Sequence, residues 1–331
     1  MHQTSTVLSI DRVSRSFGRG DRRRTVVNGL SLRVHEGEIV CLLGPNGAGK
    51  TTTVKMASTL LAPDDGTVTV CGVDAVARPA QARRHLSLVL GGERGFYLRA
   101  SAIDNLRFFA QIAAVPHHEQ ERRIADALEQ VSLTDRRDAR VETFSRGMRQ
   151  RLHIARAVVG SSRLLLLDEP TTGLDVESAL QIRRIVAGLR QQGKGVLLTT
   201  HAMPEAEFLA DRVVVISSGT AVASGTVREL AGRVRIDGVS SYTVPQDWRE
   251  DDADRVRWPG CVRNVETGVH NGVCMIDVAW CGGEPAGRDL PDGLRRSGSR
   301  EATLEDVYLA LLRSSRRDGA GDGRGVADGG R

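Results

Sequence analysis

The chain is 331 residues long, 40% apolar and 26% charged, and its 46 basic and 41 acidic residues leave a net charge of +5. This length allows one large domain plus a smaller one, and the composition is ordinary for a globular protein. No apolar run is long enough to span a bilayer, and residues 1–10 hold no basic segment followed by an apolar one. We therefore expect neither a membrane span nor a signal peptide, and a role at a membrane would need another chain as anchor.

The charged residues are interspersed along the chain, which is typical of a solvated surface. This pattern lends little support to a basic face for nucleic acid or anionic lipid. The five cysteines are odd in number and form no C-x-x-C pair, so the sequence suggests neither a disulfide framework nor a zinc site. A reducing compartment fits this cysteine content best.

Strand-like and helix-like segments follow one another in a recognisable order. The strands expected in the first part of the chain lie at 7–13, 26–34, 38–43, 67–71 and 85–90. Helical periodicity covers 102–160, and the later elements are strands at 164–167, 195–200 and 212–217 and helices at 177–191 and 204–210. This alternation of strands and helices indicates a mainly parallel sheet covered by helices.

The stretch from Gly44 to Thr51 fits the pattern G-x-x-x-x-G-K-[ST] without a mismatch. An apolar run, 39–43, leads into it and an expected helix, 50–60, leads out, which is the context that a phosphate-binding loop requires. Its glycines let successive N–H groups and the helix N-terminus point at one anion. Lys50 would reach the β- and γ-phosphates, and the Thr51 hydroxyl would ligate Mg²⁺. The alternative is a glycine-rich turn before a helix that happens to carry lysine.

A buried-type strand, 164–167, runs directly into Asp168 and Glu169. Next to a phosphate loop, Asp168 would hold Mg²⁺ directly or through water. Glu169 would reach a water in line with the γ-phosphate and act as a general base. Taken alone, an apolar run followed by two acidic residues would only mark a strand end that meets the polar surface.

A third signal begins at Phe144-Ser145-Arg146-Gly147-Met148. Ser145 reads as the N-cap of a helix that continues through Val158. Its hydroxyl and the first helical amides would also form a second anion site.

With these motifs in this order, the chain resembles the ATP-binding subunits of ABC transporters over roughly residues 5–230. The phosphate loop matches Walker A, 164–169 matches Walker B, and 145–151 matches the signature segment. Gly173-Leu174-Asp175 looks like the D-loop, in which Asp175 is the candidate site residue.

Two single residues extend this resemblance. His201 follows an expected strand as the switch histidine does, and Phe17 occupies the position of the aromatic residue that stacks on adenine. Read in isolation, His201 would be a surface histidine that caps a helix, and Phe17 would be a core residue.

The resemblance implies an α/β P-loop NTPase fold with ABC-type antiparallel β and helical subdomains, the helical one at about 92–160. ATP and Mg²⁺ are the implied cofactors. Two copies would form a head-to-tail homodimer that encloses two ATP molecules. The implied ATP-binding residues are Phe17, Gly44, Pro45, Asn46, Gly47, Ala48, Gly49, Lys50, Thr51 and Thr52. The implied signature residues, which act on the other copy's ATP, are Ser145, Arg146, Gly147 and Met148. Thr51 and Asp168 are the implied Mg²⁺ ligands, and Glu169 and His201 the implied catalytic residues.

The chain departs from the family pattern at two places. Three members of the usual L-S-G-G-Q signature are replaced, in a form that resembles the subset pairing with ABC-2-type permeases in drug, antibiotic, polysaccharide or sodium export. The family glutamine that follows the strand at 85–90 would fall at Gly91. We therefore expect water to replace one Mg²⁺ ligand and hypothesise that Glu93 or Arg94 takes over contact with the membrane subunit.

The remainder of the chain has a different character. Residues 232–314 hold short β-like pieces such as 262–265 and 272–280 and end in an amphipathic helix, 302–312. They resemble the small α+β accessory domains of the same subset, for which dimer support or permease contact is the expected role. Residues 315–331, rich in glycine and charge, are expected to be disordered.

The leading interpretation is an ATP hydrolase coupled to transmembrane transport, held at the cytoplasmic face of the membrane by its permease. A soluble ABC-type ATPase that acts on DNA or the ribosome would carry coiled-coil insertions, zinc-binding cysteines or two ATPase modules, none of which appears in the sequence. A regulatory nucleotide binder is a third alternative, disfavoured by the presence of both Glu169 and His201. No nucleic acid partner is expected.

Overall fold

The computed structural model of the chain describes residues 5–90, 95–245, 248–249, 252–256, 258–270 and 273–321. The chain divides into two compact units, Met1–Ala221 and Val222–Arg331. No helix among the described residues is long and apolar enough to cross a bilayer.

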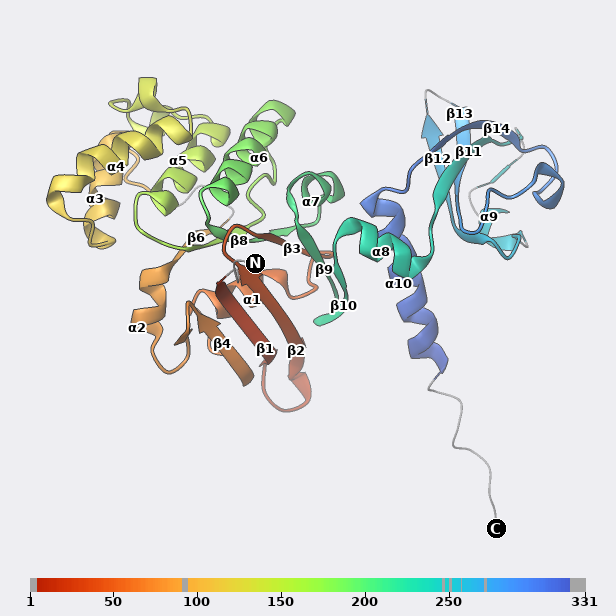
Figure 1. Cartoon of the computed structure of the whole chain (residues 1–331), viewed down its shortest axis with the longest axis horizontal. Helices are drawn as coiled ribbons and strands as arrows, with labels where there is room; N and C mark the ends of the chain where they lie inside the picture. Colours follow the sequence, from red (N-terminus) through yellow and green to blue (C-terminus); the bar gives the residue numbers. More distant parts are fainter. Residues whose placement is uncertain are drawn as a thin grey trace, which may run out of the picture. The chain divides into compact units, whose positions relative to one another are not determined.

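The first unit contains two sheets (Figure 1). An antiparallel sheet has the order β2-β1-β4-β5, and a six-stranded sheet has the order β10-β9-β3-β8-β7-β6, in which β6, β7, β8, β3 and β9 are parallel. The strands are β1 (Thr6–Phe17), β2 (Arg24–His35), β3 (Ile39–Leu43), β4 (Asp65–Val70), β5 (Val73–Asp74), β6 (Leu86–Leu90), β7 (Leu164–Asp168), β8 (Gly195–Thr200), β9 (Arg212–Ser217) and β10 (Thr220–Gly225), the last of which crosses the boundary between the units. The predicted parallel sheet is confirmed.

Seven α-helices belong to this described part of the first unit. They are α1 (Lys50–Ala57), α2 (Pro79–Ala82), α3 (Ala102–Ile112), α4 (His117–Gln130), α5 (Arg146–Val158), α6 (Val176–Gln191) and α7 (Met203–Leu209). The helices α3, α4 and α5 pack on one another, as Figure 1 shows, and they form the predicted helical region. The helix predicted for 50–60 is shorter than expected, because Ser58 ends it and Thr59 adopts a positive φ of 65°.

The main core of the first unit lies between its two sheets, with α1 between them. Fully buried side chains come from the antiparallel sheet (Leu8, Leu30), from α1 (Val54) and from the parallel sheet (Leu42, Leu197). Apolar side chains from both sheets therefore pack around α1 and exclude water from it. The amino end of α1, where the phosphate loop ends, is thereby held at the carboxyl edge of β3.

The second unit is an α+β domain, as predicted. Its described elements are α8 (Val227–Val234), β11 (Gly238–Thr243), α9 (Asp252–Arg255), β12 (Val262–His270), β13 (Val273–Trp280), β14 (Arg295–Arg300) and α10 (Leu304–Gly321). The strands form an antiparallel sheet in the order β12-β13-β11-β14. Thr226 and Glu229 form a capping box at the start of α8.

The last helix is longer than predicted. Leu304, Val307, Tyr308 and Leu311 share its buried face, as their spacing indicated. The helix continues to Gly321, so residues 315–321 of the expected disordered tail are helical. Arginine and alanine favour helix and extend one that is already nucleated. The prediction of disorder gave more weight to the glycine content of the tail. The rest of the tail lies outside the described residues.

His153, in α5, is an unusual member of the helical region. It is 2% exposed, its ring lies 4.3 Å from that of Phe96, and neither ring nitrogen has a hydrogen-bond partner in the structure. Burial, together with the charge of Arg156, lowers the pKa of His153 to about 4. Since an unfolded histidine has a pKa near 6.5, the unfolded state binds a proton first as the pH falls, and stability is lost from about pH 6.5 downward.

We expect His153→Phe to lessen this acid sensitivity, because phenylalanine keeps the ring contact and does not titrate. Between pH 7.5 and pH 5, urea unfolding of the wild type should lose about 2 kcal/mol more than unfolding of the variant. His118→Phe, at a histidine side chain that is 81% exposed, serves as the control and should behave as the wild type does. An identical pH dependence in His153→Phe and wild type would contradict the assignment.

Candidate functional site

The loop between β3 and α1 has a backbone conformation that requires glycine at two positions. Gly47 and Gly49 have positive φ of 82° and 106°. A Cβ at Gly49 would lie 2.8 Å from the Val26 carbonyl oxygen, so a larger residue cannot enter without displacing backbone. Gly49 is also the N-cap of α1, which directs the unpaired N–H groups of the first helical turn toward the loop.

Lys50 is the first residue of α1 and is only 5% exposed. Its ammonium group donates to the carbonyl oxygens of Gly44 (2.7 Å) and Pro45 (3.2 Å). It also lies 3.3 Å from a carboxylate oxygen of Glu169. A buried cation with these partners is held at the mouth of the loop.

Asp168 is the last residue of β7 and is 7% exposed. It accepts hydrogen bonds from the hydroxyls of Thr51, at 2.9 Å, and Thr199, at 2.5 Å. The parallel register of β7 with β8 sets Asp168 directly opposite Thr199. The two predicted Mg²⁺ ligands, Thr51 and Asp168, are thus brought together.

Glu169 turns its backbone into the left-handed region, with a φ of 49°. Its second carboxylate oxygen receives hydrogen bonds from the Thr172 hydroxyl (2.9 Å) and from Nδ1 of His201 (3.0 Å). Burial opposes ionisation of Glu169, but these two hydrogen bonds and the charge of Lys50 together lower its pKa. The carboxylate is therefore ionised and shared between Lys50 and His201.

These residues form an anion site with an acid–base centre beside it. The helix terminus and Lys50 are suited to phosphate oxygens, and Glu169 to accepting a proton from water. No cluster of three or more metal-ligating side chains occurs among the described residues. Mg²⁺ does not need one, because it commonly takes one or two carboxylates together with phosphate oxygens and waters. Thr51 and Asp168 therefore fit Mg²⁺ bound to a nucleotide.

Phe17 is the last residue of β1, in the antiparallel sheet, and is 43% exposed. A phenylalanine that only packed a core would be covered, so the exposure of this ring disfavours the core-residue alternative. The remaining loop residues predicted to bind ATP, from Gly44 to Thr52, all lie between the end of β3 and the first turn of α1.

The signature residues stand apart from this loop. Ser145 caps α5 by accepting from the Met148 N–H, as predicted for an N-cap. No hydrogen bond or ion pair joins residues 145–148 to residues 44–51 in the part of the chain that the structure describes. Gly147 and Arg146 instead pack on the segment that follows β7: a Cβ at Gly147 would overlap Ser178, and one at Gly173 would overlap the Arg146 guanidinium.

Asp175, the candidate D-loop residue, caps α6. Its carboxylate accepts from the N–H and the hydroxyl of Ser178, each at 2.8 Å, and these hydrogen bonds lower its pKa. Ser178 therefore links the D-loop to the beginning of the signature helix. Gly91, Glu93 and Arg94, which concern the missing family glutamine, lie outside the described residues.

Sequence reasoning missed one residue of the site, Thr199, and a buried carboxylate, Glu205. Thr199 is fully buried and holds both Asp168, through its hydroxyl, and the Glu169 N–H, at 3.1 Å. Glu205, in α7, is fully buried, neither of its carboxylate oxygens has a hydrogen-bond partner in the described structure, and burial raises its pKa. In a single sequence, a threonine near the end of a buried strand gives no sign of its role. Glu205 could have been noticed, because it is a carboxylate four residues after His201.

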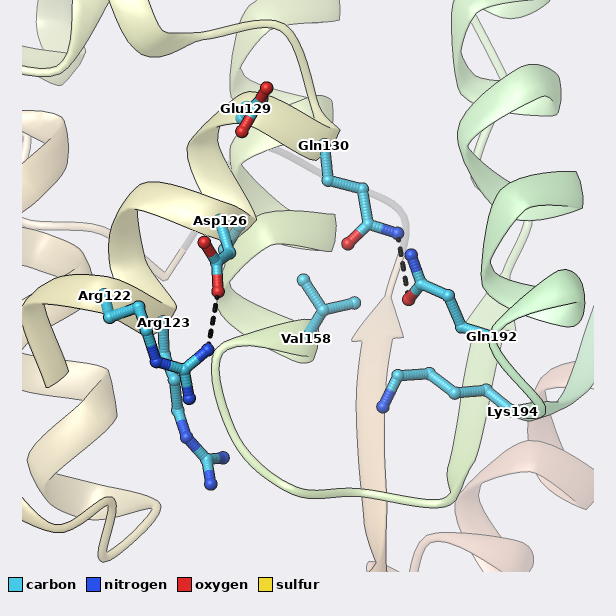
Figure 2. Close-up of a pocket in the computed structure, with 9 residues that line it drawn as sticks. Arg122, Arg123, Asp126, Glu129, Gln130, Val158, Gln192 and Lys194 are labelled. Atoms are coloured by element: carbon cyan, nitrogen blue, oxygen red, sulfur yellow. Dashed lines mark hydrogen bonds and ion pairs between the residues drawn. The ribbon is translucent and has the colours of Figure 1, made fainter. Parts of the chain in front are cut away.

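A hollow of about 580 Å³ is lined by α4, the end of α5 and the residues just before β8 (Figure 2). It therefore lies near the amino end of β8, whereas the phosphate loop lies at the carboxyl ends of the strands. Lys194, which lines it, precedes β8, whereas His201 follows that strand. The cations of this hollow are engaged: Lys194 donates to the Ser162 carbonyl (2.7 Å), and Arg122 pairs with Asp126 (3.1 Å). We therefore place the functional site at the phosphate loop.

The family model described as "ABC transporter" matches residues 27–172. The chain is 39% identical over 212 residues to the ABC transporter ATP-binding protein NatA of Bacillus subtilis, which covers 63% of this chain and 86% of that protein. It is 37% identical over 238 residues to the linearmycin resistance ATP-binding protein LnrL of the same species, covering 72% and 75%. The Nod factor export ATP-binding protein I of Cupriavidus pinatubonensis is 35% identical over 315 residues, covering 95% and 93%.

The fold is similar to that of a solved ATP-binding subunit of an ABC transporter. The TM-score is 0.61 at 28% identity, over 69% of this chain and 92% of that one. The similarity to the Nod factor export protein differs in extent, because it includes the second unit.

We expect Thr199→Val to destabilise the protein, because it removes the shorter of the two hydrogen bonds to a buried oxygen of Asp168 and leaves only the 3.3 Å contact with Thr51. The free energy of unfolding in urea should fall by about 1–3 kcal/mol. Thr199→Ser keeps the hydroxyl and should lose about 1 kcal/mol or less, the contribution of one methyl group. Equal losses in the two variants would show that the hydroxyl contributes nothing.

Proposed function

The chain belongs to the ATP-binding proteins of ABC transporters, and on this premise we propose that it hydrolyses ATP to power export through a separate ABC-2-type membrane permease. The observation that carries the catalytic part is the constellation of Lys50, Thr51, Asp168, Glu169 and His201 around one loop. Export as the direction is supported by relatives named for linearmycin resistance and Nod factor export. These names also favour transport over action on nucleic acid.

ATP would occupy the loop with its β- and γ-phosphates at Lys50 and its Mg²⁺ at Thr51 and Asp168. The metal would neutralise phosphate charge, which is its usual contribution to phosphoryl transfer. Glu169 would accept a proton from the attacking water, and His201 would contact the γ-phosphate. Phe17 would stack on adenine.

The separation of Ser145 and Gly147 from the loop supports a site shared between two copies of the chain. Ser145 would present its hydroxyl, and the start of α5 its amides, to the ATP of the other copy. Gly147 packs on Ser178, and Ser178 is hydrogen-bonded to Asp175. A displacement of the D-loop would therefore also displace the start of the signature helix, α5. Binding of two ATP molecules would close the pair, and hydrolysis would reopen it.

The catalytic assignment is tested by Glu169→Gln. ATP should still bind, steady-state turnover should fall by about a hundredfold or more, and an ATP-dependent dimer should accumulate in sedimentation experiments. Lys50→Ala is the contrasting variant and should lose nucleotide affinity. Normal turnover by Glu169→Gln would exclude the general-base role.

A second hollow, of about 870 Å³, is the surface we propose for the permease at the cytoplasmic face of the membrane. It is lined by β6, the end of α3 and the end of α5, and Arg83, Arg84 and the 66% exposed Ile112 belong to its lining. Tyr97 and Phe108 add exposed aromatic area on the same helical region. An apolar segment with acidic flanks fits this combination.

We expect Ile112→Asp to abolish co-purification with the permease, because it introduces an unpaired charge into an apolar contact. ATP binding by the isolated chain should not change. The control is Leu60→Asp, at a side chain of similar exposure (57%) that follows α1 and does not line the hollow. If both variants still co-purify with the permease, the hollow is not the contact.

A further inference from the structure

The end of β1 that carries Phe17 is held by an unusually complete set of contacts from one residue, Asp64. Its carboxylate accepts from the Arg15 guanidinium (2.7 Å) and from the Ser16 N–H (2.8 Å), and its own N–H donates to the Ser14 carbonyl (2.8 Å). Asp64 thus fixes three consecutive residues of the strand. Asp64 lies in the segment that joins α1 to β4.

Arg15 and Phe17 are two residues apart near the end of β1, and their side chains are in contact. The guanidinium carbon of Arg15 lies 5.2 Å from the centre of the Phe17 ring, in cation–π geometry. A second hydrogen bond, to the Ala62 carbonyl (3.1 Å), keeps the guanidinium in this place.

The backbone on both sides of Phe17 also restricts where its ring can lie. The pairing of β1 with β2 shifts register between Arg15 and Ser16, and such a bulge redirects the side chains that follow it. Gly18, next in the chain, has a φ of 88°, and a Cβ there would overlap the Arg22 carbonyl. The ring is therefore fixed by the strand on one side and by a tight turn on the other.

We propose that Arg15, anchored by Asp64, is a positioning residue for the nucleotide base: its guanidinium covers one face of Phe17 and leaves the opposite face for adenine. The cation draws ring electron density toward itself, so the free face repels the π-face of a purine less than an isolated ring does. This inference rests on the proposed stacking role of Phe17. It assigns Arg15 to base affinity and not to phosphate binding.

The test compares ADP with inorganic pyrophosphate, which has no base and would occupy the phosphate loop alone; neither is turned over during calorimetry. In Arg15→Gln, the affinity for ADP should fall about two- to fivefold and that for pyrophosphate should not change. Phe17→Ala should weaken ADP alone, and adding Arg15→Gln to it should have no further effect. Arg12→Gln, at an 82% exposed side chain of the same strand, should bind both ligands as the wild type does.

Each other outcome has a distinct meaning. Equal losses for ADP and pyrophosphate in Arg15→Gln would make its role purely structural and overturn the inference. Unchanged ADP affinity in Arg15→Gln, with a loss in Phe17→Ala, would overturn the inference and leave base stacking intact. Unchanged ADP affinity in Phe17→Ala would remove the stacking role itself, and a wild-type chain that binds neither ligand would overturn the proposed function.

Discussion

The ion pair between Lys50 and Glu169 is the interaction on which the site depends. It joins the first residue of α1 to the residue that directly follows β7, and the Lys50 side chain is almost fully buried. A lysine that is 5% exposed requires a counter-charge, and the polyphosphate of a nucleotide is a stronger one than a single carboxylate. Under the proposed function, nucleotide binding would draw Lys50 away from Glu169, which keeps its contact with His201. The general base would then become available to the attacking water only when the substrate is in place.

The need to hold these groups in place accounts for the apolar packing of α1 and the two sheets around it. The phosphate loop holds its shape because β3 is fully buried and α1 is packed between two sheets. Asp168 keeps its orientation through the Thr51 and Thr199 hydroxyls, one from the helix and one from the neighbouring strand. Hydrogen bonds at the carboxyl edge of the sheet are thus supported by hydrophobic packing beneath it.

Local sequence was sufficient for the features that depend on neighbours in the chain. The loop from Gly44 to Thr51, the acidic end of β7 and the cap at Ser145 were all predicted because spacing alone defines them. Contacts between distant residues, such as Thr199 with Asp168 and Asp64 with Arg15, follow from strand register and could not be predicted from one sequence. In the second unit, the strands β11 and β14 carry polar and charged residues, so their apolar pattern was too weak to predict them.

The proposed exchange of partners at Lys50 is tested most directly by a structure of the full chain with Mg²⁺ and a non-hydrolysable ATP analogue. We expect the ammonium group of Lys50 to contact the β- and γ-phosphates and the Glu169 carboxylate to lie beyond ion-pair distance from it. A nucleotide seated in the loop with Lys50 and Glu169 still 3.3 Å apart would contradict the exchange and, with it, the role given to Glu169.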